Sequence, residues 1–242
     1  MPELGAVERR YQDRPSLAAG VAARIAETLM SALAVRPRAS LILPGGTTPG
    51  PVFDRLSTAD LDWSRVDVTL SDERWVAPNH ADSNERLVGE RLLRNKAAMA
   101  RLISLYRALP KPSAALAEIG LALGAMTRPF DVALLGLGAD GHFASLFPGR
   151  PELSAGLDRE AKAQVIALDE PANGHPRISL SLAALLNTRL ILVLFQGMDK
   201  YAVLETAKSA GSSLDLPIRA LLDQDMTPVE AHPREISSQA ST

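Results

Sequence analysis

A histidine and an aspartate stand together in a glycine-rich segment, Gly136–His142, that follows an apolar run. The segment reads GLGADGH, so Asp140 and His142 are two residues apart on a turn. Histidine titrates near neutral pH, and a neighbouring carboxylate can hold its ring for general base catalysis. A lone histidine is more often structural. At a strand end, in a glycine loop and beside an acid, His142 is a candidate general base.

A second glycine-rich segment, Pro44–Pro49, reads PGGTTP and predicts an anion-binding loop. Gly45 and Gly46 let backbone N–H groups approach an anion, and the hydroxyls of Thr47 and Thr48 add donors. The alternative is a tight turn in which a threonine serves as a helix N-cap. Since no lysine follows the glycines, the segment is not a Walker loop.

Charged side chains follow a third apolar run, in Ser71–Trp75, which reads SDERW. Surface charge at a strand end is the ordinary explanation, but these charges directly follow a strand predicted to be buried. We therefore assign a functional role to Asp72 or Arg74, and Glu73 is equally well explained as a structural partner of a nearby arginine. Later in the chain, Lys200 begins a predicted helix and is placed to bind the same anion as the threonine loop.

Several other kinds of site are disfavoured. The G-x-G-x-x-G pattern within Gly136–Gly141 is a weak dinucleotide signal, because it lies mid-chain and Pro148 arrives before a long helix could form. The chain has no cysteine, no H-x-x-x-H pair and no G-x-S-x-G elbow, so we predict neither a catalytic metal nor a serine-hydrolase triad. We expect the remaining histidines to be surface residues: His80, His175 and His232.

Composition sets the class of protein. The chain has 242 residues, a formal net charge of −2 and 4% aromatic residues, which disfavours a nucleic-acid binder. The polar start is not a signal peptide, and no apolar run approaches the roughly 20 residues of a membrane span. We expect one cytoplasmic domain over residues 1–242, with a loose polar tail from about residue 227.

Helical and strand-like patterns alternate along the chain, which predicts an α/β fold with a mostly parallel sheet flanked by helices on both faces. Predicted strands cover residues 41–43, 66–70, 130–135, 165–168 and 190–195, and predicted helices cover residues 17–33, 83–93, 113–126, 180–186 and 199–209. Ligands bind beyond the carboxyl ends of such strands. The polar loops described above fall at these ends.

Taken together, the motifs resemble those of the 6-phosphogluconolactonases. The resemblance runs in the family's order from about Tyr11 to Leu222 and is carried by Leu43–Pro49, Ser71–Val76, Gly136–His142, Ala144–Gly149, Pro176–Leu180 and Gly197–Lys200. The related amino-sugar-phosphate deaminases share the D-G-H loop and a late G-x-x-K. Their second motif tends to read D-E-Y, whereas this chain has D-E-R, which favours the lactonase.

The resemblance implies hydrolysis of 6-phospho-D-glucono-1,5-lactone to 6-phospho-D-gluconate in the oxidative pentose phosphate pathway, with no metal or other cofactor. His142 is then the base that activates water, and either Asp140 or Asp72 orients it or binds sugar hydroxyls. Arg74 and the amides of Gly136–Gly141 are candidates to stabilise the oxyanion. The phosphate is expected on Gly45, Gly46, Thr47, Thr48, Arg177 and Lys200.

Two alternatives remain: an amino-sugar-phosphate deaminase or isomerase, and a non-catalytic sugar-phosphate binding protein. The expected partner is a small-molecule lactone, with no nucleic acid or membrane, and the chain is a monomer or a small homo-oligomer. Two positions depart from the family pattern. Phe143 stands where a threonine is usual, and the stretch before Arg177 has fewer prolines than usual.

Overall fold

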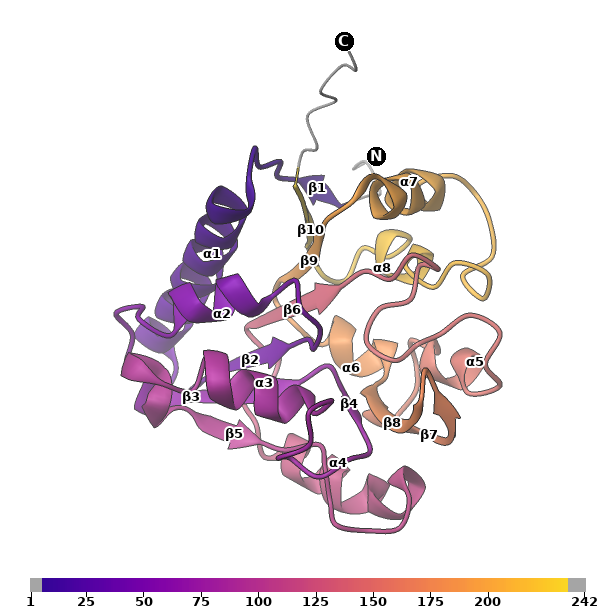
Figure 1. Ribbon diagram of the computed structural model, residues 1–242, viewed down its shortest axis with the longest axis horizontal. Helices are drawn as coiled ribbons and strands as arrows, with labels where there is room; N and C mark the ends of the chain where they lie inside the picture. Colours follow the sequence, from indigo (N-terminus) through magenta and orange to yellow (C-terminus); the bar gives the residue numbers. More distant parts are fainter. Residues whose placement is uncertain (1–5, 235–242) are drawn as a thin grey trace.

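The computed structural model describes residues 6–234, which form an α/β fold around one central sheet (Figure 1). All neighbouring strands of this sheet are parallel. Their order is β1 (Val7–Glu8), β10 (Val229–Pro233), β9 (Ile191–Phe195), β6 (Val132–Gly136), β2 (Ala39–Leu43), β3 (Val66–Leu70) and β5 (Arg101–Ile103). Every residue of β2, β3 and β9 is buried, including the polar Ser40, Asp67 and Thr69, as expected for a sheet covered on both faces.

Helices cover both faces of the sheet, as the alternating pattern predicts. Parallel strands are joined by right-handed crossovers, so the direction of travel along the sheet decides which face each helix covers. The chain moves one way through β2, β3 and β5, then back through β6, β9 and β10. One face therefore carries α1 (Arg14–Val35), α2 (Gly50–Leu56) and α3 (Asn84–Arg91), and the other α4 (Leu116–Gly124), α6 (Leu182–Leu186), α7 (Met198–Ala207) and α8 (Arg219–Leu222).

The longest helix shows how local sequence sets element boundaries. The side chain of Asp13 accepts a hydrogen bond from the Ser16 amide in a capping box, and α1 ends before Pro37. Among the described helices, α1 alone is long and apolar enough, by length and composition, to cross a membrane. Its buried residues pack into the core against the sheet, which accounts for that apolar composition.

A second, antiparallel sheet was not predicted. It consists of β4 (Asp72–Arg74), β8 (His175–Leu180) and β7 (Val165–Ala172), and the short α5 (Leu153–Gly156) packs against β7. In its register Asp72 lies opposite Ser179, and Arg74 lies opposite Arg177. The small sheet therefore brings together two charged segments that are a hundred residues apart in the sequence.

The expected loose tail is partly wrong. Residues 229–233 form β10, a fully buried strand that pairs with β9 over five residues. His232, which we expected on the surface, is 0% exposed. Its Nδ1 lies 3.0 Å from the hydroxyl of Tyr11, and Arg9 and Arg24 donate hydrogen bonds to the neighbouring Glu230. The rest of the predicted tail, residues 235–242, lies outside the described residues.

Candidate active site

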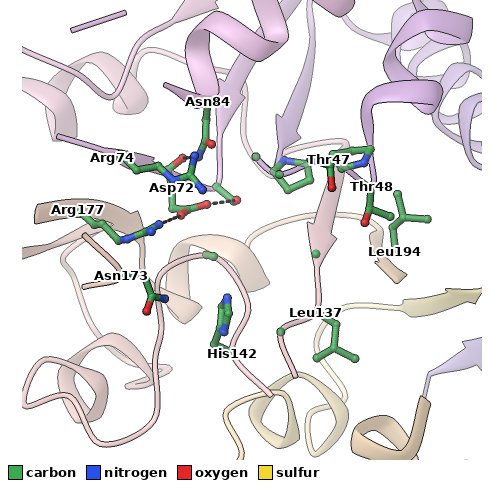
Figure 2. A pocket seen from close by; sticks show the side chains of 18 of the residues that line it. Thr47, Thr48, Asp72, Arg74, Asn84, Leu137, His142, Asn173, Arg177 and Leu194 are labelled. Atoms are coloured by element: carbon green, nitrogen blue, oxygen red, sulfur yellow. Dashed lines mark hydrogen bonds and ion pairs between the residues drawn. The ribbon is translucent and has the colours of Figure 1, made fainter. Parts of the chain in front are cut away.

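A cavity of about 440 Å³ opens at the carboxyl edge of the central sheet, beside β2 and β6 (Figure 2). These two strands are neighbours, and the chain leaves them toward opposite faces. Diverging loops at such a switch point leave a crevice in which ligands bind. Of the ten predicted site residues, the cavity is lined by nine: Gly45, Gly46, Thr47, Thr48, Asp72, Arg74, His142, Arg177 and Lys200.

The tenth, Asp140, lies directly behind the histidine. Its Oδ1 is 2.5 Å from Nδ1 of His142 and also accepts a hydrogen bond from the His142 backbone amide. With Nδ1 donating to the carboxylate, Nε2 is the acceptor, and it has no hydrogen-bond partner among residues 6–234. Burial raises the pKa of Asp140, but the charge of His142 and its hydrogen bonds outweigh burial and hold the pKa below its usual range.

Two neighbours fix the position of this pair. The ring of His142 packs on Phe147, with centroids 4.5 Å apart. A Cβ atom on Gly138 would lie 2.1 Å from Nδ1 of His142, so only glycine fits there. Gly141 has a φ of +79°, which a side chain would strain. The glycine motif thus serves close packing and a tight turn around the histidine.

Asp72 belongs to a different network. It is buried and accepts hydrogen bonds from the hydroxyls of Ser71 (3.0 Å) and Ser145 (2.6 Å), and Nη1 of Arg177 lies 3.6 Å from it. No described contact joins it to His142. The geometry therefore separates the two aspartates, with Asp140 at the histidine and Asp72 beside a buried arginine.

Arg177 and Arg74 approach the cavity from adjacent strands of the small sheet. Burial lowers the pKa of Arg177, whose Nε donates to the carbonyl of Ala172 at 2.8 Å. Nη1 of Arg74 donates to the carbonyl of Asp82, while its Nε is buried and unpaired within the described part of the chain. Both guanidinium groups therefore retain donors for a ligand.

No arginine side chain among residues 6–234 forms a hydrogen bond or ion pair with Glu73, although its charge acts on nearby Arg177. Its carboxylate accepts hydrogen bonds from the backbone amides of Arg74, Asn84 and Glu85 and from the hydroxyl of Ser83. Burial raises the pKa of Glu73 to about 7, although these backbone donors act in the opposite direction. Glu73 therefore anchors the start of α3 against β4.

The threonine loop and Lys200 also line the cavity. Gly46 has a φ of +85°, and α2 begins after Pro49 without a side-chain cap, so neither threonine serves as the N-cap. The hydroxyls of Thr47 and Thr48 and the ammonium of Lys200 have no hydrogen-bond or ion-pair partner in the part of the chain that the structure describes. Lys200 lies in the first turn of α7.

The cavity is also lined by residues to which the sequence reasoning assigned no role, among them Asn84, Phe147 and Asn173. Asn84 is buried, and its Nδ2 donates to the carbonyl of Asp72. Asn173 lies on the turn between β7 and β8, and the Asn-Gly pair there is a hairpin signal that could have indicated that turn. Phe143, which replaces the usual threonine, is buried in the core and does not line the cavity.

Within residues 6–234 no group of three or more histidine, aspartate or glutamate side chains is arranged to hold a metal ion. Metal independence stays a prediction.

Comparison with known proteins agrees with this geometry. The family model for glucosamine-6-phosphate isomerases/6-phosphogluconolactonase matches residues 12–229. The chain belongs to this family. It is 37% identical over 222 residues to a 6-phosphogluconolactonase of Rhizobium meliloti, covering 92% of this chain and 96% of that one. It is 42% identical over 223 residues to a 6-phosphogluconolactonase of Caulobacter vibrioides, covering 90% and 93%.

A solved structure places the fold in the same family. The crystal structure of a 6-phosphogluconolactonase from Shewanella baltica superimposes with a TM-score of 0.91 at 37% sequence identity. The match covers 95% of this chain and 98% of that chain. The central sheet and the elements around the cavity are therefore a shared framework.

Proposed function

We propose that this protein hydrolyses 6-phospho-D-glucono-1,5-lactone to 6-phospho-D-gluconate, the second step of the oxidative pentose phosphate pathway. One observation carries the proposal. A histidine whose Nδ1 is held by Asp140 faces the same cavity as two threonine hydroxyls and a lysine that have no partner among residues 6–234. A base and an anion-binding wall in one cavity suit a substrate with an electrophilic carbonyl at one end and a phosphate at the other.

In this mechanism Nε2 of His142 takes a proton from a water molecule as the water oxygen attacks C1 of the lactone. Asp140 keeps the proton of the free imidazole on Nδ1 and stabilises the imidazolium that forms. The tetrahedral intermediate then expels the ring oxygen, which receives the proton back from Nε2, and the open-chain acid ionises. A well-placed base of this kind contributes about 10²–10⁴ in rate.

The negative charge that develops on the carbonyl oxygen requires donors. We assign this role to Arg74 and the amides of Gly136–Gly141, whose segments line the cavity, and each well-placed donor contributes a few kcal/mol. The remote phosphate binds Gly45, Gly46, Thr47 and Thr48, and Arg177 and Lys200 supply positive charge. Binding energy from the phosphate then orients the lactone toward the base.

The test compares two substrates with and without a metal chelator. The lactone is generated in situ, and its spontaneous hydrolysis is subtracted; glucosamine 6-phosphate is assayed in parallel. We expect lactone hydrolysis well above background, unchanged by the chelator, and no turnover of the amino sugar. Turnover of glucosamine 6-phosphate alone would assign the deaminase alternative, and phosphosugar binding without any turnover would assign a binding protein.

A further inference from the structure

The turn between β7 and β8 carries a polar side chain into the candidate active site. Asn173 has a φ of +51° and Gly174 a φ of +91°, and the flanking residues Ala172 and His175 pair across the hairpin. Two central residues with positive φ define the type of two-residue turn for which Asn-Gly is a favoured sequence. Turn geometry alone thus explains the residue type at position 173, but not the direction of its side chain.

Three contacts from outside the turn hold this hairpin end in place. Nε of Arg177 donates to the carbonyl of Ala172, and the backbone amide of Trp75 donates to the carbonyl of Pro176, each at 2.8 Å. On the other side of the hairpin, Nε2 of His175 lies 2.9 Å from a carboxylate oxygen of Asp82. The position of residue 173 is therefore set by the same small sheet that positions Arg177.

The carboxamide of Asn173 faces the cavity and lies between Arg177 and His142 in the view of Figure 2. It makes no hydrogen bond to any described residue. In this it resembles Thr47, Thr48 and Lys200, which also line the cavity without protein partners. Unlike the cations nearby, a carboxamide is neutral and both donates and accepts, which suits a sugar hydroxyl better than a phosphate or an oxyanion.

We propose that Asn173 binds a ring hydroxyl of the sugar lactone and is a specificity-determining residue of this enzyme. The inference rests on the proposed function. A 1,5-lactone of this kind has free hydroxyls at C2, C3 and C4, between the carbonyl that reacts and the carbon that bears the phosphate. Asn173 recognises one of these three, which favours the intact sugar over an analogue that lacks that hydroxyl.

The experiment measures kcat/KM of the wild type and Asn173→Gly on the lactone and on its 2-, 3- and 4-deoxy analogues. Glycine keeps the positive φ and removes only the carboxamide. Asn95→Gly is the matched control, because Asn95 also has a φ of +51° and does not line the cavity. Melting temperatures of all three proteins verify that the fold is retained.

We expect Asn173→Gly to lower kcat/KM on the intact lactone by about tenfold, the value of one good hydrogen bond. The wild type discriminates against one deoxy analogue by a similar factor, and Asn173→Gly loses that discrimination, whereas Asn95→Gly keeps it. If wild type and Asn173→Gly share the same kcat/KM and the same discrimination, Asn173 serves the turn alone and the inference is wrong. A wild type with no activity above background would instead overturn the proposed function, and this inference with it.

Discussion

The two edges of the central sheet differ in whether certain polar side chains have hydrogen-bond or ion-pair partners within the protein. At the amino edge, Asp131 and Asp67 are 0% and 1% exposed, and both are fully partnered. Asp131 accepts hydrogen bonds from Nη1 of Arg36 and from the backbone amide of Ser40. The carboxylate of Asp67 lies between the guanidinium groups of Arg38 and Arg101.

Arg38 and Arg101 both donate to Asp67 through their Nε atoms. Burial raises the pKa of Asp67, but these arginines outweigh burial, so the pKa lies below its usual range. For Asp131 burial is the larger effect and raises the pKa. Both carboxylates use their hydrogen-bonding capacity within the protein, which is what a structural role requires.

At the carboxyl edge, polar groups are left free. Nε2 of His142, the hydroxyls of Thr47 and Thr48, the carboxamide of Asn173 and the ammonium of Lys200 all face one cavity without partners among the described residues. Charge at a sheet edge therefore does not by itself indicate function. Polar groups that face a cavity without protein partners are the ones available to a substrate.

The largest expected effect is on catalysis. His142→Ala removes the base, and we expect kcat for lactone hydrolysis to fall by about 10²–10⁴. The free energy of unfolding should fall by no more than about 1 kcal/mol, because the variant loses the contacts with Asp140 and Phe147 but the ring is partly exposed. Background-subtracted initial rates at saturating lactone measure the first quantity. A kcat within threefold of wild type would show that His142 is not the general base.

A substitution at the amino edge should lower stability and leave kcat unchanged. Asp131→Ala leaves Arg36 and the amide of Ser40 without their acceptor in a buried site, so we expect about 3 kcal/mol less free energy of unfolding. Urea titration measures the loss. The folded variant should keep wild-type kcat at low temperature, and a tenfold lower kcat would show that the edges are not independent.

His232 lies near the carboxyl edge, at the end of β10, but does not line the cavity. Burial lowers its pKa to about 4, against 6.5 for an ordinary histidine. Between these values the unfolded chain binds more protons than the folded chain, so stability falls as pH drops from about 6.5 to about 4. The loss is up to about 3 kcal/mol. Above pH 6.5 the histidine is neutral in both states and adds no pH dependence.

His232→Gln removes this titration. The charged groups that face His232 are Glu230, Arg9 and Arg24, and they remain in the variant. We expect urea midpoints of the wild type to fall more steeply than those of the variant between pH 6.5 and pH 4.5, with kcat at pH 7 unchanged. Parallel pH profiles of the two proteins would contradict the buried, neutral histidine.

The smallest effect is expected at Lys200, one of the residues proposed to bind the phosphate. Lys200→Ala removes a cation far from the reacting carbonyl, so we expect KM to rise about tenfold while kcat stays within about threefold. Lys208→Ala is a matched control, because Lys208 follows the same helix but pairs with Glu8 and Glu205. An equal KM in both variants would show that Lys200 does not bind the phosphate.

The strands built mostly of apolar residues were predicted from the sequence: β2, β6, β9 and also β3, in spite of Asp67. The rule that ligands bind at carboxyl strand ends selected the loops that line the cavity. The sequence did not predict β10, which reads VEAHP. This strand is buried because Glu230 and His232 find partners about two hundred residues away, which no local pattern shows.

The candidate active site also depends on contacts between residues that are far apart in the sequence. Asp140 and His142 are neighbours in the sequence, so their contact was foreseeable, but the choice between Asp140 and Asp72 required the fold. Ser145 reaches Asp72 only because β4 pairs with β8, a pairing of two short strands from distant segments. The direction of the Asn173 side chain likewise depends on the position of that small sheet.

The most direct test measures kcat and the free energy of unfolding on the same preparations of wild type, His142→Ala and Asp131→Ala. We expect a crossed result. His142→Ala loses at least about a hundredfold in kcat and no more than about 1 kcal/mol of stability, and Asp131→Ala loses about 3 kcal/mol of stability with unchanged kcat. If His142→Ala loses as much stability as Asp131→Ala, or if His142→Ala retains its kcat, the assignment of chemistry to the carboxyl edge is wrong.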